Sequence, residues 1–268
     1  MKQHRTVPSY LPVRALLPDK EQPAPMKVSE YFDRLYGDRD RYWWREDARY
    51  STDPVAHPTS LLTQMTLRAI AGRAPGRALD IGAGEGADSI RLALLGYAVE
   101  AVEISKIGAA KIRRFATEAG VADRIRVEVA DITSYVPQGS FDVILCNGVL
   151  QYVEDKKTVI GLMQDSTVAD GINVISLWSK YTEVPDCHKT VDIFCDDEDG
   201  VVYGLYQDWT IEILYFDRDK TESSHAGMPR HSHSHVKLIA RRALLGDAGQ
   251  LAIRMKAQAM SDGRDTSS

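Results

Sequence analysis

The sequence predicts an α/β protein built on a doubly wound, mostly parallel sheet. Three observations lead to this prediction. Short apolar segments alternate with helical ones between residues 60 and 178, a glycine-rich turn follows the first of the apolar segments, and the alternation stops after Trp178. Regular alternation of strands and helices is typical of a parallel sheet that is covered by helices on both faces.

The first half of this alternation begins with a helix at Ser60–Ala71, in which Leu61, Leu62, Met65 and Ala69 recur at a spacing of three and four. A strand is expected at 77–81, the glycine turn at 82–86 and an apolar helix at 87–95, ended by Gly96. A second strand at 97–102 precedes a helix at 105–119, for which Ser105 is the expected N-cap.

The second half continues with strands at 125–129 and 141–146, a helix at 155–166 and a strand at 172–178. An insert at 179–208, which holds the acidic run 196–199, interrupts the rhythm. Two strands at 209–216 and 236–242 have no helix between them. They predict an antiparallel hairpin at the far edge of the sheet, with a long loop over 217–235.

The two ends of the chain differ from the middle. Residues 1–25 contain five prolines, and residues 28–50 are rich in aromatic side chains among charges. The aromatic stretch is interpreted as a helical layer on the main domain or as a lid over a ligand, and the two are compatible. We therefore expect an arm and aromatic lid at 1–57, a main domain at 58–245, and a C-terminal helix and flexible tail at 246–268.

Composition narrows the classes of function. The chain has 268 residues, and 33 Lys and Arg against 38 Asp and Glu give a net charge of −5, which argues against a nucleic-acid partner. Three cysteines are too few for a disulfide framework or a paired CxxC zinc site, so a reducing compartment is expected. We identify no signal peptide and no membrane span, and expect a cytoplasmic protein; the oligomeric state stays open.

The glycine turn, Gly82-Ala-Gly-Glu-Gly-Ala87, fits both a dinucleotide fingerprint and the shorter GxGxG turn. Asp80, near the end of the first strand, decides between them. A carboxylate at that place repels a pyrophosphate and attracts an ammonium or sulfonium group. A cationic nucleotide is therefore favoured over a nicotinamide cofactor.

Two further acidic residues follow strands of the same sheet. Glu103 ends the second strand, where a carboxylate accepts both hydroxyls of a ribose. Asp131 follows the third strand, placed to accept from an exocyclic amine while Ile132 packs on a flat base. Because ligands of such sheets bind at the carboxyl ends of the strands, the three carboxylates together suit an amino group, a ribose and an adenine.

These motifs, Ala-Leu-Asp-Ile-Gly-Ala-Gly-Glu-Gly, Glu103, Ala-Asp-Ile and Phe-Asp-Val-Ile-Leu-Cys-Asn, resemble the class I S-adenosylmethionine-dependent methyltransferases over about residues 58–242. The resemblance implies a seven-stranded sheet with a terminal antiparallel hairpin, and S-adenosylmethionine as cofactor. It places Asp80, Gly82 and Gly84 near the methionine part, Glu103 on the ribose, Asp131 and Ile132 at the adenine, and Asn147 beside the cofactor. Within the superfamily the chain is most similar to tellurite-resistance-type small-molecule methyltransferases, through 208–214 and 236–242.

The acceptor and the catalytic groups are less defined by the sequence. The predicted hairpin loop holds His225, Arg230 and His231-Ser-His233-Ser-His235, and the three alternating histidines share one side if the strand begins early. They suit a solvated loop, a base or substrate contact, or a metal site. We assign catalysis to His225, Arg230, His233 and Tyr152, substrate contacts to Tyr36, Tyr42, Trp178 and Tyr181, and no metal site. Cys187 and His188 are adjacent, and adjacent side chains rarely point the same way.

The sequence thus predicts an enzyme that transfers the methyl group of S-adenosylmethionine to a small-molecule acceptor. Two alternatives remain open: transfer or cyclisation of the aminocarboxypropyl chain with release of methylthioadenosine, and a non-catalytic protein that binds the cofactor.

Overall fold

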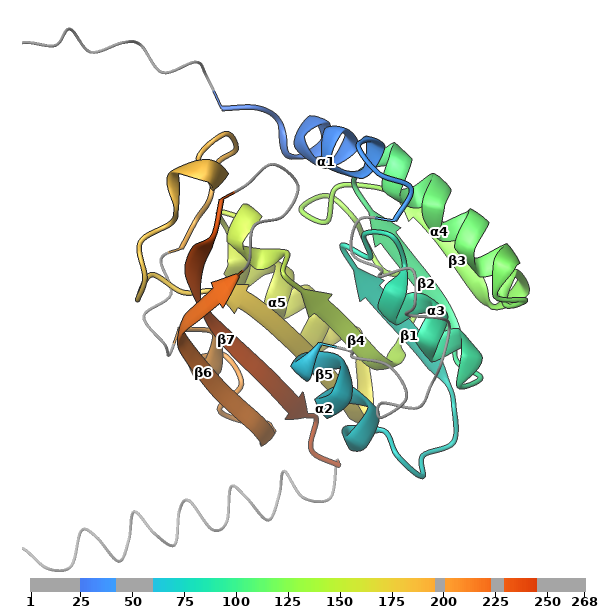
Figure 1. The fold of residues 1–268 in the computed structure, drawn as a ribbon. Coiled ribbons are helices and arrows are strands. Elements are labelled where there is room, and N and C mark those ends of the chain that lie inside the picture. The colour runs from blue at the N-terminus through green and yellow to red at the C-terminus, as the bar shows by residue number, and fades with distance from the viewer. Residues whose placement is uncertain (1–24, 42–59, 196–200, 223–228, 245–268) are drawn as a thin grey trace, which may run out of the picture.

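The computed structural model describes residues 25–41, 60–195, 201–222 and 229–244. These residues form one seven-stranded sheet of order β3-β2-β1-β4-β5-β7-β6 (Figure 1). The strands are β1 (Arg77–Ile81), β2 (Ala98–Glu103), β3 (Ile125–Val129), β4 (Phe141–Asn147), β5 (Thr167–Trp178), β6 (Thr210–Glu222) and β7 (His231–Arg241). Strands β1 to β5 pair in parallel, and β7 runs antiparallel to both of its neighbours. The predicted doubly wound sheet with a terminal antiparallel hairpin is confirmed.

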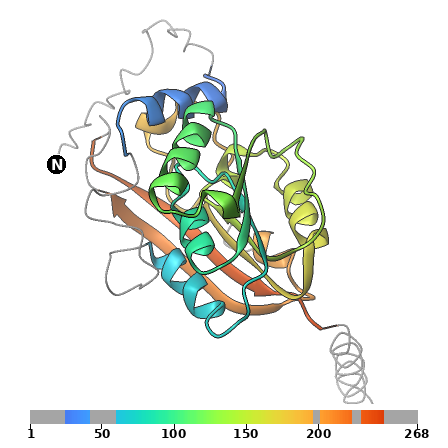
Figure 2. The same ribbon diagram turned by 90° about the vertical axis from the view of Figure 1, so that its right-hand side faces the viewer.

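Helices cover both faces of the sheet, and Figure 2 shows α4 and α5 on opposite sides of it. The helices are α1 (Val28–Gly37), α2 (Leu61–Ala69), α3 (Ala87–Leu94), α4 (Lys106–Glu118), α5 (Lys156–Asp165) and the short α6 (Val201–Gly204). Single 3-10 turns form η1 (Ala122–Arg124), η2 (Leu150–Tyr152) and η3 (Asp186–His188). No helix in the described ranges is long and apolar enough to cross a membrane.

Strand β4 shows how the sequence builds the two cores. Val143 and Leu145 join the buried cluster that includes residues of α2, α3 and α4, whereas Ile144 and Cys146 join the cluster that includes residues of α5 and α6. Successive side chains of a strand point to opposite faces, so an unbroken apolar run is required when both faces are covered. Cys146 is a buried core residue, as its position in the strand predicted.

The hairpin is longer than predicted. β6 continues through Asp217–Glu222 and β7 begins at His231, so most of the predicted loop over 217–235 is paired strand. This part of the sequence predicted a loop because it is rich in charged and polar side chains, which are typical of loops. However, β6 is the edge strand of the sheet, where charges are tolerated and where backbone pairing with β7 satisfies the ladder.

Strand β5 also begins earlier than predicted, at Thr167 instead of Ile172. Asp170 has a φ of +62°, and the sequence Asp170-Gly171 therefore has the character of a turn. Arg73 holds this irregular point in place, because its guanidinium donates to the Asp170 carboxylate at 2.9 Å and to the Asp170 carbonyl at 2.7 Å. A tertiary contact thus lets the strand continue through a turn-like dipeptide.

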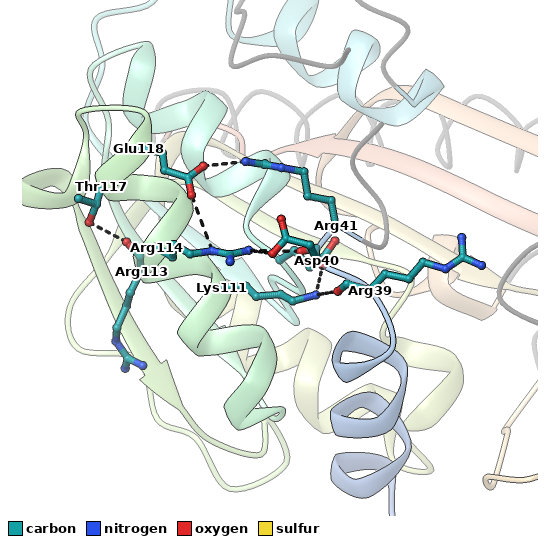
Figure 3. A network of polar contacts seen from close by, with 9 residues as sticks. Arg39, Asp40, Arg41, Lys111, Arg113, Arg114, Thr117 and Glu118 are labelled. Atoms are coloured by element: carbon teal, nitrogen blue, oxygen red, sulfur yellow. Dashed lines mark hydrogen bonds and ion pairs between the residues drawn. The ribbon is translucent and has the colours of Figure 1, made fainter. Parts of the chain in front are cut away.

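Helix α1 packs against the N-terminal end of α4, at the carboxyl end of the sheet (Figure 1). Ser105, the predicted N-cap of α4, accepts from Gly108 N–H at 3.0 Å and donates to the Asp33 carboxylate of α1 at 2.6 Å. Residues just after α1 also bind α4 (Figure 3). The Lys111 ammonium donates to the Arg39 carbonyl at 2.5 Å, and Arg41 pairs with Glu118 at 2.6 Å. The aromatic segment is therefore a helical layer on the main domain for its described part.

Candidate functional site

The carboxyl ends of the parallel strands open into a cavity of about 530 Å³. All seven predicted cofactor residues line this cavity, and they come from β1, β2, β4, the glycine turn and the loop after β3. They are Asp80, Gly82, Gly84, Glu103, Asp131, Ile132 and Asn147. Side chains and turns that are distant in sequence meet here because parallel strands end at the same edge of a sheet.

The glycine turn has a backbone that requires glycine. Gly82, Gly84 and Gly86 have φ values of +64°, +59° and +85°. A Cβ on Gly82 would lie 2.2 Å from Cγ2 of Val149, so the backbone approaches its neighbour too closely for any side chain. The turn is tied to β2, because Gly82 N–H donates to the Val102 carbonyl at 2.8 Å.

Asp80 is a buried carboxylate at the floor of the cavity, with 3% of its surface exposed. The Ser89 hydroxyl donates to it at 2.5 Å. Burial, followed by the charge of Asp88 and with a smaller contribution from Glu103, raises the pKa of Asp80 to about 7. A cationic ligand beside Asp80 would favour the ionised carboxylate and offset the cost of burying its charge.

Glu103 is equally buried, at 3% exposure. Its carboxylate accepts from Gly84 N–H at 2.7 Å and from Ser105 N–H at 2.8 Å. Burial raises the pKa of Glu103 to about 7, although these hydrogen bonds act in the opposite direction. Each carboxylate oxygen can accept more than one hydrogen bond, so hydroxyl groups of a ligand can still be bound.

The remaining cofactor residues differ in their exposure. Asp131 is exposed and accepts from the backbone N–H and hydroxyl of Thr133 at 2.9 and 2.7 Å. Ile132 beside it is 9% exposed, as suits an apolar surface under a flat ring. Asn147 ends β4, and its amide nitrogen lies 3.4 Å from an Asp88 oxygen.

Aromatic rings form a further part of the cavity wall. Tyr36, Tyr152 and Trp178 all line it, as predicted for substrate or catalytic contacts, and Phe32 of α1 joins them. The Phe32 ring meets Tyr152 edge-on with centroids 5.2 Å apart and stacks on Tyr36 at 5.6 Å. Helix α1 therefore contributes a wall of the cavity as well as a layer on the domain.

Other predicted residues lie elsewhere. Tyr181 is 60% exposed and outside the cavity lining, with the Arg218 guanidinium 4.5 Å above its ring. Arg230 is also exposed and outside the lining, because it directly precedes β7 at the end of the hairpin where β6 and β7 are connected. The structure thus supports neither a substrate contact by Tyr181 nor catalysis by Arg230. The predictions for His225 and Tyr42 fall outside the described residues.

The histidines of β7 do not form a solvated loop. His231 begins the strand, so the three histidines share one face, and His233 and His235 are 3% and 8% exposed. Burial lowers the pKa of His233 to about 4 and that of His235 to about 3, so both rings are neutral at pH 7. His233 stacks on Trp178 with centroids 3.9 Å apart and lies behind the cavity lining, whereas His235 lines the cavity.

Sequence reasoning missed several residues of the cavity wall. His188, Lys220, Glu222 and Lys237 line it without having been assigned to it. His188 is buried, and the ligand atoms of Cys187, His188 and His231 lie within 4.8 Å of one another, so the expectation that Cys187 and His188 diverge is wrong. Lys220 and Glu222 are two residues apart, so they point to the same face of a strand. This spacing could have indicated a shared site only if the predicted strand had been extended to Glu222.

The sequence matches the model of the methyltransferase domain family over residues 74–221. Ubiquinone biosynthesis O-methyltransferase of Xanthomonas euvesicatoria pv. vesicatoria (strain 85-10) is 32% identical over 119 residues, which cover 44% of this chain and 48% of that protein. The chain thus spans about half the length of the curated relatives it matches.

Solved structures share the fold. TehB from Haemophilus influenzae has a TM-score of 0.57 and 21% identity, covering 70% of this chain and 65% of TehB. The N-methyltransferase NodS from Bradyrhizobium japonicum WM9, in complex with S-adenosyl-L-homocysteine, has a TM-score of 0.54 and 18% identity, covering 80% of this chain and 97% of NodS. Identities this low show the fold alone. With the family match over residues 74–221 and the site geometry above, the chain belongs to the methyltransferase domain family of the class I S-adenosylmethionine-dependent methyltransferases.

Proposed function

We propose that this protein binds S-adenosylmethionine in the cavity at the carboxyl end of the sheet and transfers its methyl group to a small-molecule acceptor. The observation that carries the proposal is that seven residues chosen for cofactor contacts line a single cavity, whose wall also includes aromatic and basic side chains. A volume of about 530 Å³ falls in the range of small-molecule sites.

The residues present fit this cofactor. The backbone at Gly82 and Gly84 leaves a cradle without side chains, and Asp80 is a buried carboxylate that suits a cationic ligand. Glu103 would accept the ribose hydroxyls, while Asp131 and Ile132 would contact the adenine. When bound, the cofactor supplies an electrophilic methyl group on a sulfonium, so the protein needs mainly to position an acceptor and exclude water.

The aromatic side chains of the cavity wall are the proposed acceptor site. Phe32, Tyr36, Tyr152 and Trp178 would hold an apolar or aromatic body by stacking and edge contacts. Among the catalytic predictions that fall on described residues, Tyr152 is the one that lines the cavity, and its role there would be to orient the acceptor. The curated relatives are named O-methyltransferases, which favours a hydroxyl acceptor over an amine.

The test is mass spectrometry of the nucleoside released when the full chain is incubated with S-adenosylmethionine, alone and with a small-molecule extract. S-adenosylhomocysteine is expected, and Asp80→Asn should slow its formation at subsaturating cofactor. Methylthioadenosine in place of S-adenosylhomocysteine would overturn the proposal in favour of aminocarboxypropyl transfer. Tight binding of the cofactor with neither product would leave a non-catalytic binding protein.

A further inference from the structure

We propose that the hairpin binds one divalent transition-metal ion through Glu222 of β6 and His231 and His233 of β7, with His188 of η3 as a fourth ligand. One oxygen of Glu222 and one ring nitrogen each of His231 and His233 all lie within 4.8 Å of one another. The cavity lining includes both Glu222 and His188, and His188 meets Trp178 edge-on with centroids 4.8 Å apart, so this site adjoins the proposed acceptor site.

The register of the hairpin brings these ligands together. Glu222 and His231 are directly paired across the β6–β7 ladder, and His233 follows two residues later on the same face as His231. Directly opposed residues of an antiparallel pair have Cβ atoms about 4.5–5.5 Å apart, and alternate residues of one strand share a face. Backbone pairing alone therefore brings two imidazoles and one carboxylate together on one face of the hairpin.

His231 is oriented as metal-bound histidines are. Its Nδ1 lies 2.6 Å from the Pro229 carbonyl, and a carbonyl only accepts, so Nδ1 carries the proton and Nε2 presents its lone pair. A metal-ligating histidine typically donates its other ring N–H to a carbonyl or carboxylate in this way. The orientation is thus set before any ion binds.

His188 completes the arrangement from a different part of the chain. Its Nε2 lies 3.1 Å from Nε2 of His231. Two nitrogens at 2.0–2.1 Å from one tetrahedral ion are separated by roughly 3.3 Å. Since Nε2 of His231 presents its lone pair, Nε2 of His188 is the donor in this contact. Both rings can therefore bind one ion once the proton of His188 moves to its other ring nitrogen.

The surroundings hold the other two ligands in place. His233 stacks on Trp178, and its buried Nε2 has no hydrogen-bond partner among the described residues. Oε2 of Glu222 lies 3.9 Å from Nε2 of His231, while Lys220 donates to Oε1 at 2.9 Å. A hydrogen bond to the second oxygen of a ligating carboxylate is usual in metal sites.

The donor types indicate the class of ion. Imidazole with carboxylate suits zinc, iron, copper or nickel, whereas magnesium and calcium prefer oxygen ligands alone. Cys187, His188 and His231 form a second convergent group around the same histidine. We assign the ion to the group that contains Glu222, because the strand register determines the geometry of that group. The test below distinguishes it from the group that contains the Cys187 thiol.

At this place the ion would serve the proposed methyl transfer, on which this part of the inference rests. A hydroxyl bound to the ion has a lowered pKa and loses its proton to water. The acceptor oxygen then forms the bond to the methyl carbon while the sulfur–methyl bond breaks, and that electron pair stays on sulfur. The acceptor class is accordingly a small molecule with an acidifiable hydroxyl that can reach both the ion and the cofactor.

The test begins with full-length protein freed of metal with a chelator and titrated, without cofactor, with Zn²⁺ by calorimetry and with Co²⁺ by visible absorption. We expect about one ion per chain and cobalt bands of a protein-bound ion. His231→Ala and Glu222→Gln should each weaken metal binding at least about tenfold. Mutating a residue that only hydrogen-bonds to a metal ligand already costs about 10–100-fold in metal affinity, so losing a ligand should cost no less. His235→Ala, on the same strand face but outside the ligand group, should leave metal affinity unchanged.

Three results would overturn the assignment. One is no binding of either ion by the wild-type chain, which needs no variant to be folded. Another is wild-type affinity in His231→Ala, with folding checked by circular dichroism. The third is loss of binding in Cys187→Ser, but not in Cys195→Ser or Glu222→Gln, which would move the ion to the group that contains the Cys187 thiol. These measurements need no turnover, so they test the metal site whether or not methyl transfer is found. Equal rates of methyl transfer with and without chelator would overturn only the catalytic role of the ion.

Discussion

The backbone N–H of Gly84 donates a hydrogen bond of 2.7 Å to Oε2 of Glu103, so the glycine turn after β1 is held directly against the end of β2. Both residues line the cavity. Glu100 lies three residues earlier on the same strand and is also buried, at 4% exposure, but it is bound by Tyr135 and pairs with Arg126 outside the cavity. The two glutamates thus form a matched pair for experiment.

Glu103→Gln should weaken binding of S-adenosylhomocysteine about fivefold, because a hydrogen bond to a charged acceptor contributes roughly 1 kcal/mol more than one to a neutral acceptor. Calorimetric titration measures this affinity. Glu100→Gln is the control, and it should lower thermal stability while leaving affinity unchanged. Equal losses of affinity in the two variants would mean that Glu103 acts only through the fold.

Gly82→Ala should reduce both stability and cofactor affinity. A positive φ disfavours alanine by about 1–2 kcal/mol, and the new Cβ would also lie 2.2 Å from the Val149 side chain. Gly120→Ala isolates the first effect, because Gly120 has a φ of +71° with nothing within 4 Å of an added Cβ. Urea denaturation should show the larger loss in Gly82→Ala, and only that variant should lose affinity. An equal loss of stability in both variants would contradict a close approach at the turn.

Affinity for S-adenosylmethionine should rise with pH between 6 and 8. Asp80 has a pKa of about 7 in the ligand-free protein, and the cationic ligand binds its ionised form, so affinity should increase about tenfold over this range. Without ligand the linkage has the opposite sign: the raised pKa stabilises the fold below pH 4, and this contribution is lost as pH rises through 7.

Calorimetry at several pH values checks this dependence. Asp80→Asn should flatten the profile apart from a remaining slope from Glu103, whose pKa also lies near 7. A wild-type profile that is already flat, or identical slopes in the wild type and the variant, would remove Asp80 from the cation site.

Tyr206→Phe should destabilise the protein by about 1–3 kcal/mol. The buried Tyr206 hydroxyl accepts from the Asn173 amide at 3.0 Å, and its loss leaves a buried donor without a partner. Tyr203 on the adjoining α6 is 42% exposed, and Tyr203→Phe should change the free energy of unfolding by less than about 0.5 kcal/mol. Urea denaturation compares the two, and equal effects would rule out the buried hydrogen bond as the cause.

Local patterns in the sequence were sufficient for the central part of the fold. The N-cap at Ser105 and the strands β1 and β4 were predictable because they depend on capping and on side-chain alternation within a few residues. The hairpin was underestimated because pairing between β6 and β7, not apolar periodicity, determines where an edge strand ends. The exposure of Tyr181 could not be read from its place after β5, since the path of the insert decides where that ring points.

The sequence by itself determined the order of strands and helices and the presence of Asp80, Glu103 and the glycine turn at strand ends, because each of these depends on neighbours in the chain. Only the tertiary structure decided that His188 meets His231 at 3.1 Å and that Glu222 lies opposite His231. Those residues belong to η3, β7 and β6, and their meeting depends on register and on loop paths that no local periodicity encodes.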